Sequence, residues 1–359
     1  MKITAVEAHI VAPQHRRPML LVRVLTDAGH YGVGESSPMN VHVLKAFIER
    51  SLAPMIIGMN AFEIEKVWRR MMFGAYKLGP GGAQFEAMAG IDIALWDIKG
   101  KALGVPVHTL LGGKVRDKVA FYASLPRYDT ADEACTIAAR CRDEGYTAVK
   151  FHTAHMWGFD DFEDDSVPVV RRSRKELGDA FGLMVDVNCG YTTANALKVG
   201  LALQELGTMH FEEPVAEYDR RGLAELADAL SMPVSAGEQC YSRWQHRDLI
   251  EQGRPDILQP DVVKTGISEL IKIVAFASAH NIPVALHNIQ PTVGTAATLH
   301  CAAAFADCTY LQEFGITDHP STSALFASIY APVDGYIETP ETPGLGLELN
   351  ETRLAELTA

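Results

Sequence analysis

Residues 183–212 read LMVDVNCGYTTANALKVGLALQELGTMHFE, and this stretch decides the predicted fold. A short apolar run from Leu183 to Val187 is followed by a longer helix-like segment and by a second apolar run from Met209 to Glu212. Buried parallel strands are short and apolar, and a helix usually connects each strand to the next. The stretch is therefore typical of one parallel βα unit, with Asp186 and Glu212 at the ends of its two strands.

The same alternation continues on both sides of this unit, from about residue 117 onward. Apolar runs stand where buried strands fit at Val119 to Ser124, Thr147 to Phe151, Leu183 to Val187, Met209 to Glu212, Pro233 to Ala236, Ile257 to Gln259, Pro283 to Leu286 and Tyr310 to Gln312. Eight successive runs predict a β/α barrel, whose eight units take roughly 250 residues.

An ionisable residue lies at the end of every run from the second to the eighth. These residues are Lys150, Asp186, Glu212, Glu238, Asp261, His287 and Glu313; the first interval is 36 residues, and the others are 26, 26, 23, 26 and 26. The intervals have the length of one barrel unit, and barrel active sites are built at the C-terminal ends of the strands. We therefore expect the seven side chains to converge on one face and form an active site.

The chain ahead of the barrel predicts an α+β domain. Lys2 to Val11, Met19 to Leu25 and Tyr31 to Gly34 have the pattern of antiparallel strands, and Gln84 to Leu103 carries apolar residues at helical spacing. We predict this domain over residues 1–115 and the barrel over residues 116–318. The tail over residues 319–359 is rich in proline and glycine, and we expect it to pack back on the first domain.

The composition is that of a globular protein, with 48% hydrophobic and 21% charged residues. The net charge of −13 lacks the basic footprint of a nucleic-acid or membrane-surface protein, so we expect neither partner. No apolar stretch reaches the roughly 18 residues of a membrane span, and the N-terminus lacks a signal-peptide pattern. These features predict a soluble, cytoplasmic protein. The six cysteines show no zinc-like spacing and are expected to be reduced, structural thiols.

Three of the strand-end residues, Asp186, Glu212 and Glu238, predict a metal site. They follow three successive strands and offer only oxygen ligands, which Mg²⁺ prefers over the nitrogen and sulfur ligands of zinc or copper. Without a cation, the three carboxylates would repel one another and raise one another's pKa. We therefore predict one Mg²⁺ ion as cofactor, with open positions for substrate oxygens.

The other strand-end residues supply acid and base groups. Lys150 and His152 are two positions apart on one strand, so both side chains point to the same face. His287 beside Asp261 is a plausible general base, because a carboxylate fixes the tautomer of an imidazole and raises its basicity. We expect Glu313 to hydrogen-bond a substrate carboxylate, as an acceptor or, if the other acids keep it protonated, as a donor.

Together these groups predict abstraction of a proton next to a carboxylate, with the negative charge stabilised by the metal and by Lys150. The predicted partner is a small-molecule carboxylic acid. A base on each face serves racemisation, and a single base can also remove the proton while a β-hydroxyl departs. A binding protein without catalytic activity is a third hypothesis, although the complete set of acid, base and metal groups argues against it.

The sequence resembles the enolase superfamily and, within it, the mandelate racemase group, whose members use a Lys or His base with Mg²⁺. The resemblance is carried by Val149-Lys150-Phe151-His152, Val185-Asp186-Val187-Asn188, Phe211-Glu212-Glu213-Pro214, Ala236-Gly237-Glu238-Gln239, Gln259-Pro260-Asp261, Leu286-His287 and Leu311-Gln312-Glu313. Gly90 to Lys101 and Leu110 to Gly113 are similar to the helix and junction of the family's capping domain, so nearly the whole chain is covered.

This resemblance implies a modified (β/α)₇β barrel with an α+β capping domain formed by the N-terminal region and the C-terminal tail. It implies Mg²⁺ on the three carboxylates, Lys150 as electrophilic lysine, His287 with Asp261 as catalytic dyad, and a homo-oligomer. Racemases of the group, and many acid-sugar dehydratases, carry a second lysine where this chain has His152. The sequence resembles acid-sugar dehydratases such as galactonate dehydratase, in which syn elimination through His287 would give a 2-keto-3-deoxy acid. The substrate would be a polyhydroxy monocarboxylate.

The alternative implied by the same residues is a racemase or epimerase of a 2-hydroxy acid, with His152 and His287 as bases on opposite faces.

Substrate-binding residues carry the weakest pattern. Asn188 follows Asp186 by two positions and is expected to point to the same face. In the family, the loop that corresponds to His15, Arg16 and Arg17 closes over the substrate, and an exposed loop is the alternative. Tyr76 is a further candidate. Gln239 directly follows Glu238 and is expected to point away, and Lys264 is predicted either near the dyad or in solvent.

Overall fold

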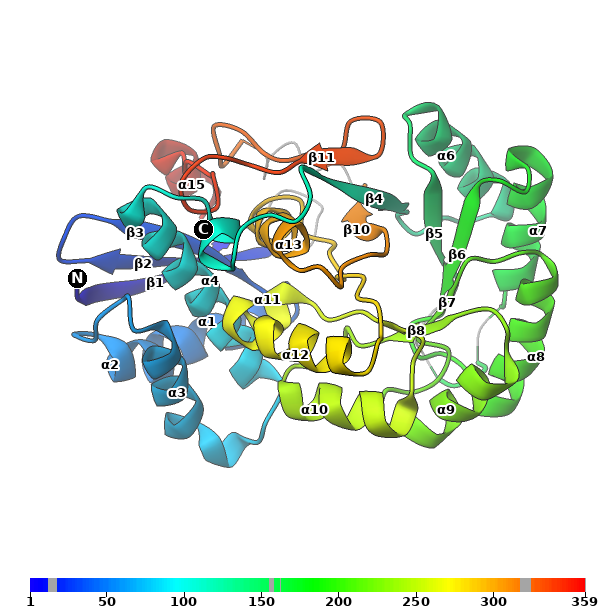
Figure 1. Ribbon diagram of the computed structural model, residues 1–359, viewed down its shortest axis with the longest axis horizontal. Coiled ribbons are helices and arrows are strands. Elements are labelled where there is room, and N and C mark those ends of the chain that lie inside the picture. The colour runs from blue at the N-terminus through cyan, green and yellow to red at the C-terminus, as the bar shows by residue number, and fades with distance from the viewer. Residues whose placement is uncertain (12–17, 155–157, 162, 317–323, 359) are drawn as a thin grey trace.

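The computed structural model describes residues 1–11, 18–154, 158–161, 163–316 and 324–358, and Figure 1 shows their arrangement. His15, Arg16 and Arg17 lie outside these residues. An antiparallel sheet with helices lies at one end of the molecule, and a curled parallel sheet surrounded by helices forms the other end. The predicted α/β class, a modified barrel with an α+β cap, is confirmed.

The cap begins with a three-stranded antiparallel sheet in the order β1-β2-β3, close to the three predicted segments: β1 Ile3–Val11, β2 Met19–Thr26 and β3 Tyr31–Ser36. Its helical part comprises α1 Val41–Phe47, a π-helical turn Ile48–Leu52, α2 Ala53–Ile56, α3 Ile64–Gly74, a 3₁₀ turn Tyr76–Leu78, α4 Ala83–Leu103 and α5 Val107–Leu110.

Helix α4 packs directly on β3 because glycines lie at the contact. A Cβ atom on Gly34 would lie 1.9 Å from the carbonyl oxygen of Gly90, so no larger residue fits without moving the helix. On its other side α4 meets the barrel helices, and Asp92 accepts a hydrogen bond from the backbone nitrogen of Ser268 at 2.9 Å. The helix therefore holds the cap against the barrel.

The barrel sheet has the strand order β10-β4-β5-β6-β7-β8-β9 with parallel neighbours. The strands are β4 Lys118–Ser124, β5 Ala148–His152, β6 Gly182–Asp186, β7 Phe211–Glu212, β8 Val234–Ala236, β9 Ile257–Leu258 and β10 Gln312–Gly315. The helices between them are α6 Ala131–Asp143, α7 Ser166–Leu177, α8 Thr193–Glu205, α9 Arg220–Ala229, α10 Arg243–Asp248 with a π-helical turn Leu249–Gly253, α11 Val262–Thr265, α12 Ile267–Ala279 and α13 Val293–Ala304.

The seventh predicted strand is present only as isolated bridges between β9 and β10. The Leu258 nitrogen donates to the Pro283 carbonyl at 3.0 Å, and the Glu313 nitrogen donates to the Leu286 carbonyl at 3.4 Å. A full ladder does not form, because the side chain of Gln312 takes the Leu286 N–H at 2.8 Å. These bonds still close the ring, which gives the (β/α)₇β connectivity.

The last strand begins later than predicted. β10 starts at Gln312, where its pairing with Phe121 of β4 begins, and not at Tyr310. Glu313 therefore lies within the strand and not after its end.

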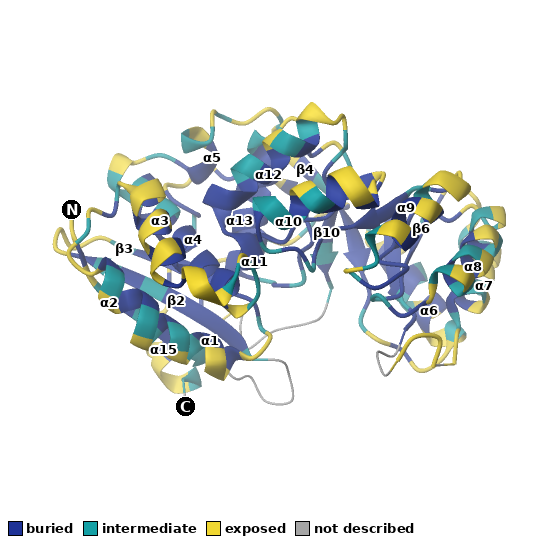
Figure 2. Ribbon diagram, turned by 90° about the horizontal axis from the view of Figure 1, so that it is seen from below, coloured by how far each residue is buried: buried dark blue, intermediate teal, exposed yellow. Residues whose placement is uncertain are grey.

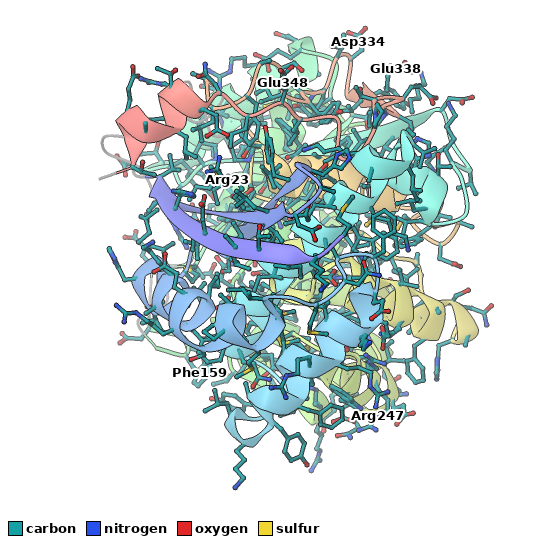
Figure 3. All side chains as sticks on the ribbon, turned by 90° about the vertical axis from the view of Figure 1, so that its left-hand side faces the viewer. Arg23, Phe159, Arg247, Asp334, Glu338 and Glu348 are labelled. Atoms are coloured by element: carbon teal, nitrogen blue, oxygen red, sulfur yellow. The ribbon has the colours of Figure 1, made fainter. Side chains whose placement is uncertain are left out.

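The C-terminal tail contacts both parts of the molecule. Its strand β11, Tyr336–Glu338, pairs antiparallel with the start of β4, which the sequence did not predict. Its helix α15, Glu351–Leu357, reaches the cap, where Glu351 forms an ion pair with Arg23 of β2. Figure 3 looks onto the cap and shows the segment with Glu338 and Glu348 passing along its upper side. The tail thus packs on the cap as predicted, while the domain boundaries stay predictions.

Burial is concentrated inside the barrel ring and between the cap sheet and α4 (Figure 2). The outer faces of the barrel helices are exposed, as expected for amphipathic helices around a parallel sheet. All six cysteines are free, and five of them are buried. In the described part of the chain, every helix is too short or too polar to traverse a lipid bilayer.

Candidate active site

The strand register brings the predicted residues together at one end of the barrel, and we call this group of side chains the ring. Its members are Lys150, His152, Asp186, Glu212, Glu238, Asp261, His287 and Glu313. β5 pairs His152 with Asp186 of β6, and β6 pairs Asp186 with Glu212 of β7. An isolated bridge pairs Asp261 with His287. Because the strands are parallel, these residues all lie at the same end of the barrel, and the ion pairs described below join them across it.

Asp186, Glu212 and Glu238 form a buried carboxylate cluster. Each offers one ligand oxygen, and the three atoms lie within 4.8 Å of one another. Burial raises the pKa of Glu238, and the neighbouring carboxylates of Asp186 and Glu212 add to this, although His287 and Lys264 oppose it. The donor set contains only oxygen, and a divalent cation would remove the repulsion, so these residues fit a hard metal ion.

Lys150 is a fully buried cation at the centre of the ring. Its Nζ lies 2.6 Å from Glu212 Oε1 and 2.9 Å from Glu313 Oε1. Burial by itself would lower the pKa of Lys150, but the carboxylates of Glu212 and Glu313 outweigh it and raise the pKa well above the ordinary value. The ammonium group is therefore charged and held by two carboxylates.

His287 and Asp261 form a dyad. His287 Nδ1 lies 2.8 Å from Asp261 Oδ2, and Asp261 Oδ1 accepts the Val263 N–H at 2.8 Å, which fixes the carboxylate at the start of α11. The other ring nitrogen, Nε2, lies 3.0 Å from Glu238 Oε2 and 3.9 Å from Glu313 Oε2. Burial would lower the pKa of His287, but Glu238, Glu313 and Asp261 raise it to about 10.

The charges around Glu313 favour the acceptor alternative considered from the sequence, because Lys150 Nζ lies 2.9 Å from its Oε1. Burial would raise the pKa of Glu313, but the positive charges of Lys150 and His287 outweigh this and lower it. Its Oε2 also accepts the Asn288 N–H at 3.2 Å. Glu313 therefore acts as an acceptor that holds Lys150 and the segment after His287.

His152 has a partner on each ring nitrogen. Its Nδ1 lies 3.0 Å from Asp186 Oδ2, and its Nε2 lies 3.0 Å from the hydroxyl of Ser124 at the end of β4. Asn188 binds the same carboxylate: its backbone nitrogen and its Nδ2 donate to the two oxygens of Asp186 at 2.7 and 2.8 Å. The expected orientation of Asn188 toward Asp186 is thus observed.

Tyr76 is not brought to this ring by any described contact. Its side chain is 61% exposed and stacks on Phe73, with ring centroids 6.2 Å apart. Its substrate role, like those of His15, Arg16 and Arg17, stays a prediction.

Gln239 lies closer to the site than expected, and Lys264 lies inside the site, which was one of its two predicted positions. Lys264 is buried, and its Nζ donates to the Glu238 carbonyl at 2.7 Å, so it is not a solvated loop lysine. Gln239 Nε2 donates to Glu238 Oε1 at 2.8 Å, so the prediction that it points away is wrong. The reason is Gly237, whose φ of 141° ends the alternation of the strand before Glu238.

Other residues of the site were missed. Gln259 Nε2 donates to Glu212 Oε2 at 2.7 Å, and Ser124 contacts His152. Gln259 and Ser124 both lie at the ends of predicted strands. The search for ionisable residues at strand ends would have found them if it had included neutral polar side chains. Arg127, in the loop after β4, is exposed, and its Nη2 lies 3.4 Å from Asn188 Oδ1. The sequence gives no signal for that contact.

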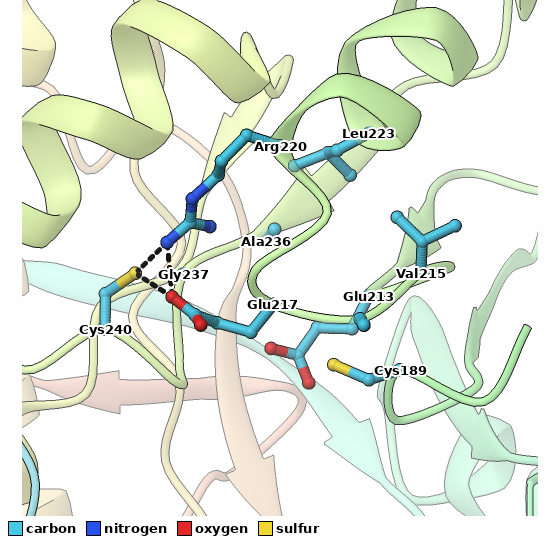
Figure 4. A pocket seen from close by; sticks show the side chains of 10 residues that line it. Cys189, Glu213, Val215, Glu217, Arg220, Leu223, Ala236, Gly237 and Cys240 are labelled. Carbon is cyan, nitrogen blue, oxygen red and sulfur yellow. Dashed lines mark hydrogen bonds and ion pairs between the residues drawn. The ribbon is translucent and has the colours of Figure 1, made fainter. Parts of the chain in front are cut away.

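A small pocket lies beside the carboxylate cluster, between the ends of β7 and β8 (Figure 4). Glu213, which follows Glu212 with a φ of 43°, points into it next to Cys189. Burial raises the pKa of Glu213 well above the ordinary value, and Glu238, Asp186 and Glu212 add to the effect. On the other side of the pocket, Arg220 bonds to Glu217 and Cys240.

The fold and the carboxylate–lysine–histidine ring define a protein of the enolase superfamily. The chain matches the family model "Enolase C-terminal domain-like" over residues 133–353 and the model "Mandelate racemase / muconate lactonizing enzyme, N-terminal domain" over residues 5–112. The chain belongs to the mandelate racemase group of this superfamily and is an enzyme.

Two curated relatives span nearly the whole chain. A D-galactonate dehydratase of Verminephrobacter eiseniae is 34% identical over 369 residues, covering 99% of this chain and 94% of the relative. A D-galactarolactone cycloisomerase of Agrobacterium fabrum is 32% identical over 384 residues, covering 99% and 98%.

A solved structure shows the same fold. The mandelate racemase/muconate lactonizing protein of Paracoccus denitrificans PD1222, complexed with magnesium, is 34% identical and has a TM-score of 0.93. The match covers 100% of this chain and 98% of the other.

Proposed function

We propose that this enzyme dehydrates a sugar acid, a polyhydroxy monocarboxylate, to a 2-keto-3-deoxy acid, with one Mg²⁺ ion as cofactor. The observation that carries the proposal is the dyad: Asp261 binds Nδ1 of His287, while Nε2 faces the carboxylate cluster beside Lys150. A base next to a buried cation and an oxygen-rich metal site is suited to removing a proton next to a carboxylate.

The proposed reaction has two proton transfers, both through His287. His287 removes the C2 proton, and the electron pair of the broken C–H bond delocalises onto the carboxylate as an enediolate. Lys150 stabilises this negative charge. The electrons then form the C2–C3 double bond as the C3 hydroxyl departs, and that hydroxyl takes the proton from His287 and leaves as water. The remaining enol tautomerises to the 2-keto-3-deoxy acid.

The metal ion would be held by Asp186, Glu212 and Glu238 through carboxylate oxygens. When bound, it supplies positive charge that offsets these carboxylates and stabilises negative charge on substrate oxygens. Asn188 and His152 orient Asp186, Gln259 and Lys150 orient Glu212, and Gln239 orients Glu238, in the way that outer partners of metal ligands usually do. 

Relatives named as dehydratases of galactonate, xylonate and mannonate support the proposed substrate class. The second candidate is a racemase or epimerase that uses His152 and His287 as bases. It is favoured by the position of His152 in the same ring, on the same strand as Lys150 and paired with Asp186 of β6. The oligomeric state and the cellular location stay predictions.

The experiment is proton NMR of the Mg²⁺-supplemented protein in D₂O against sugar acids, with D-galactonate, D-xylonate, D-mannonate and a galactarolactone in the panel. A 2-keto-3-deoxy product that is lost in His287→Asn, with unchanged circular dichroism, is the expected result. Inversion at C2 without loss of water would support the racemase, and dehydration that persists in His287→Asn would reject the mechanism.

A further inference from the structure

Two carboxyl groups of the cap reach the first turns of two barrel helices. Glu35 Oε2, on β3, accepts the Gly294 N–H of α13 at 2.9 Å, and Asp92 Oδ2, on α4, accepts the Ser268 N–H of α12 at 2.9 Å. Both carboxyl groups are buried. Gly294 and Ser268 are each the second residue of their helix. The first N–H groups of a helix have no partner within it, so each carboxyl takes the place of an N-cap side chain.

The residues before the two helices leave this place open. Gly266, which precedes α12, has no side chain. Thr292, which precedes α13, directs its hydroxyl to the cap, where it hydrogen-bonds Glu35 and lies 3.3 Å from Met19 Sδ. Each helix therefore depends on a cap carboxyl to hold its first turn.

Helix α13 is connected closely to the dyad. It follows His287 after residues 288–292, and these five described residues contain no helix or strand. Asn288 Nδ2 donates to the Thr295 hydroxyl in the first turn of α13 at 2.9 Å, and the Asn288 N–H donates to Glu313 Oε2 at 3.2 Å. A series of bonds thus leads from Glu35 through the start of α13 to the residue next to His287.

We propose that Glu35 is a positioning residue through which the cap holds His287 in place against Asp261. Its carboxyl fixes the start of α13, and α13 fixes the backbone that follows His287. Strand β3 also contacts α11, which begins directly after Asp261, so one strand of the cap borders both halves of the dyad. This inference rests on the proposed function and deepens it, because it names a residue outside the barrel on which the proton transfers depend.

Glu35 can hold α13 without carrying a charge. Burial raises the pKa of Glu35 to about 8; the Gly294 N–H opposes this effect, and Asp261 adds to it. A neutral carboxyl, like an amide, keeps a carbonyl oxygen that accepts an N–H. Glu35→Gln therefore retains the bond to Gly294, whereas Glu35→Met removes it and keeps the length of the side chain.

The first test needs no substrate. Hydrogen exchange followed by mass spectrometry should show residues 288–295 exchanging about 5- to 10-fold faster in Glu35→Met than in the wild-type protein, because the first turn of α13 has lost its acceptor. Glu35→Gln should exchange at the wild-type rate. Unchanged exchange over residues 288–295 in Glu35→Met would overturn the proposal.

The second test measures steady-state kinetics with a substrate identified by the dehydration assay. In Glu35→Met, kcat should fall by about 100-fold and KM should change by less than about 3-fold, because a displaced base slows the reaction while the groups that bind the substrate carboxylate are unchanged. Glu35→Gln should stay within about 3-fold of the wild-type kcat. Wild-type turnover by Glu35→Met, or equal losses in both variants, would contradict the positioning role.

Asp92→Leu is the matched control. It removes the equivalent bond to Ser268, but α11 lies between Ser268 and the dyad, and the Val263 N–H of α11 already fixes Asp261 at 2.8 Å. Exchange should rise at the start of α12, and kcat should change by less than about 3-fold. A loss of kcat equal to that of Glu35→Met would mean that any loosening of the cap slows the enzyme, and the specific role of Glu35 would be rejected.

Thr295→Val tests the same connection from its other end and decides the matter if Glu35→Met does not fold. The Thr295 hydroxyl bonds to Asn288 and to the Gln290 carbonyl, so its removal should also release residues 288–292 and lower kcat by about 10- to 100-fold. The double variant Glu35→Met/Thr295→Val should be within about 3-fold of the slower single variant, because both substitutions interrupt one connection. Wild-type kcat in Thr295→Val, or losses that multiply, would overturn the proposal.

The two kinds of measurement separate this inference from the proposed function. If no sugar acid is dehydrated, the proposed function fails, while hydrogen exchange still decides whether Glu35 holds the segment after His287. Dehydration by the wild-type protein together with an unchanged kcat in Glu35→Met would overturn this inference alone.

Discussion

The ring at the strand ends and the rim around it are built in opposite ways. In the ring, Lys150, Glu212 and Glu313 are fully buried, and each is fixed by at least one ion pair. The rim is the loop after β4, where Arg127 is exposed. Buried charges are costly unless they are paired, so the ring has essentially one low-energy arrangement, whereas rim side chains can be exchanged at small cost. We infer that the ring determines the reaction and that the rim selects the substrate.

The largest effect on turnover is expected from the loss of the metal ion predicted at Asp186, Glu212 and Glu238. Removing divalent cations with a chelator should reduce turnover by about 10⁴-fold or more, and Mg²⁺ should restore it, since the charge of the substrate enediolate would otherwise be unbalanced. Glu238→Gln should behave like the chelated protein, and Glu225→Gln, an exposed residue of α9, should remain active. Full turnover after chelation would refute the predicted metal dependence. Isothermal calorimetry on the same samples measures ion binding directly.

The second prediction compares one buried and one exposed lysine. Lys150→Met leaves the buried carboxylates of Glu212 and Glu313 without their cation, which should cost about 3–5 kcal/mol of unfolding free energy in the metal-free protein. Lys77→Met, on the exposed turn Tyr76–Leu78, should change it by less than about 0.5 kcal/mol. Urea denaturation followed by circular dichroism measures both. Equal stabilities would mean that the ring is not held together by its ion pairs.

The sequence predicts the residues at the strand ends better than it predicts the residues beyond them. Asp186, Glu212 and His287 were found because strands of a barrel repeat at nearly constant intervals and end at one face. The direction of Gln239 was not found, because this residue lies beyond the end of β8. There Gly237 takes a φ of 141° and the strand alternation no longer applies. The backbone conformation of such a turn depends on contacts between strands, which the local sequence does not reveal. At Gly237, the contact is with the backbone of Gln259.

The fold shows the same limit. The cap strands and α4 were predicted to within two residues, because each has its own apolar period. The segment Pro283 to Leu286 was predicted as a strand, but Gln312 takes one of its N–H groups. The pairing of β11 with β4 joins residues more than 200 positions apart, and no local sequence pattern predicts it.

A third prediction concerns pH and sharpens the roles within the ring. His287 acts as a base only when unprotonated, so turnover should rise with pH through its pKa. Burial would lower that pKa, but Glu238, Glu313 and Asp261 raise it to about 10. A cation on Glu238 would weaken the largest of these contributions, so the acid limb of the Mg²⁺-loaded enzyme should lie between about 6.5 and 10.

The variant for this prediction is Asp261→Asn. It removes a negative charge from His287 Nδ1, so the acid limb should move to lower pH, and the rate at the plateau should fall by about 100-fold, because the ring loses the partner that fixes its tautomer. Profiles of kcat/KM against pH measure both changes. A limb that stays in place would show that the titrating base is a different residue.

The smallest effect is expected on the rim, and it tests whether the rim selects the substrate without taking part in the reaction. Arg127 bonds to the Ala154 carbonyl and to Asn188 Oδ1, both neutral acceptors, and no ion pair neutralises it among the described residues. Its guanidinium therefore keeps donors for substrate hydroxyls or carboxylates. Arg127→Ala should raise KM by about 10-fold and change kcat by less than about 3-fold, since uniform binding is lost while the ring is intact. Arg142→Ala, on the outer surface, is the matched control. If kcat fell by about 100-fold, as is expected for Asp261→Asn, then Arg127 would belong to the reacting ring through Asn188 and Asp186, and the division between ring and rim would be wrong.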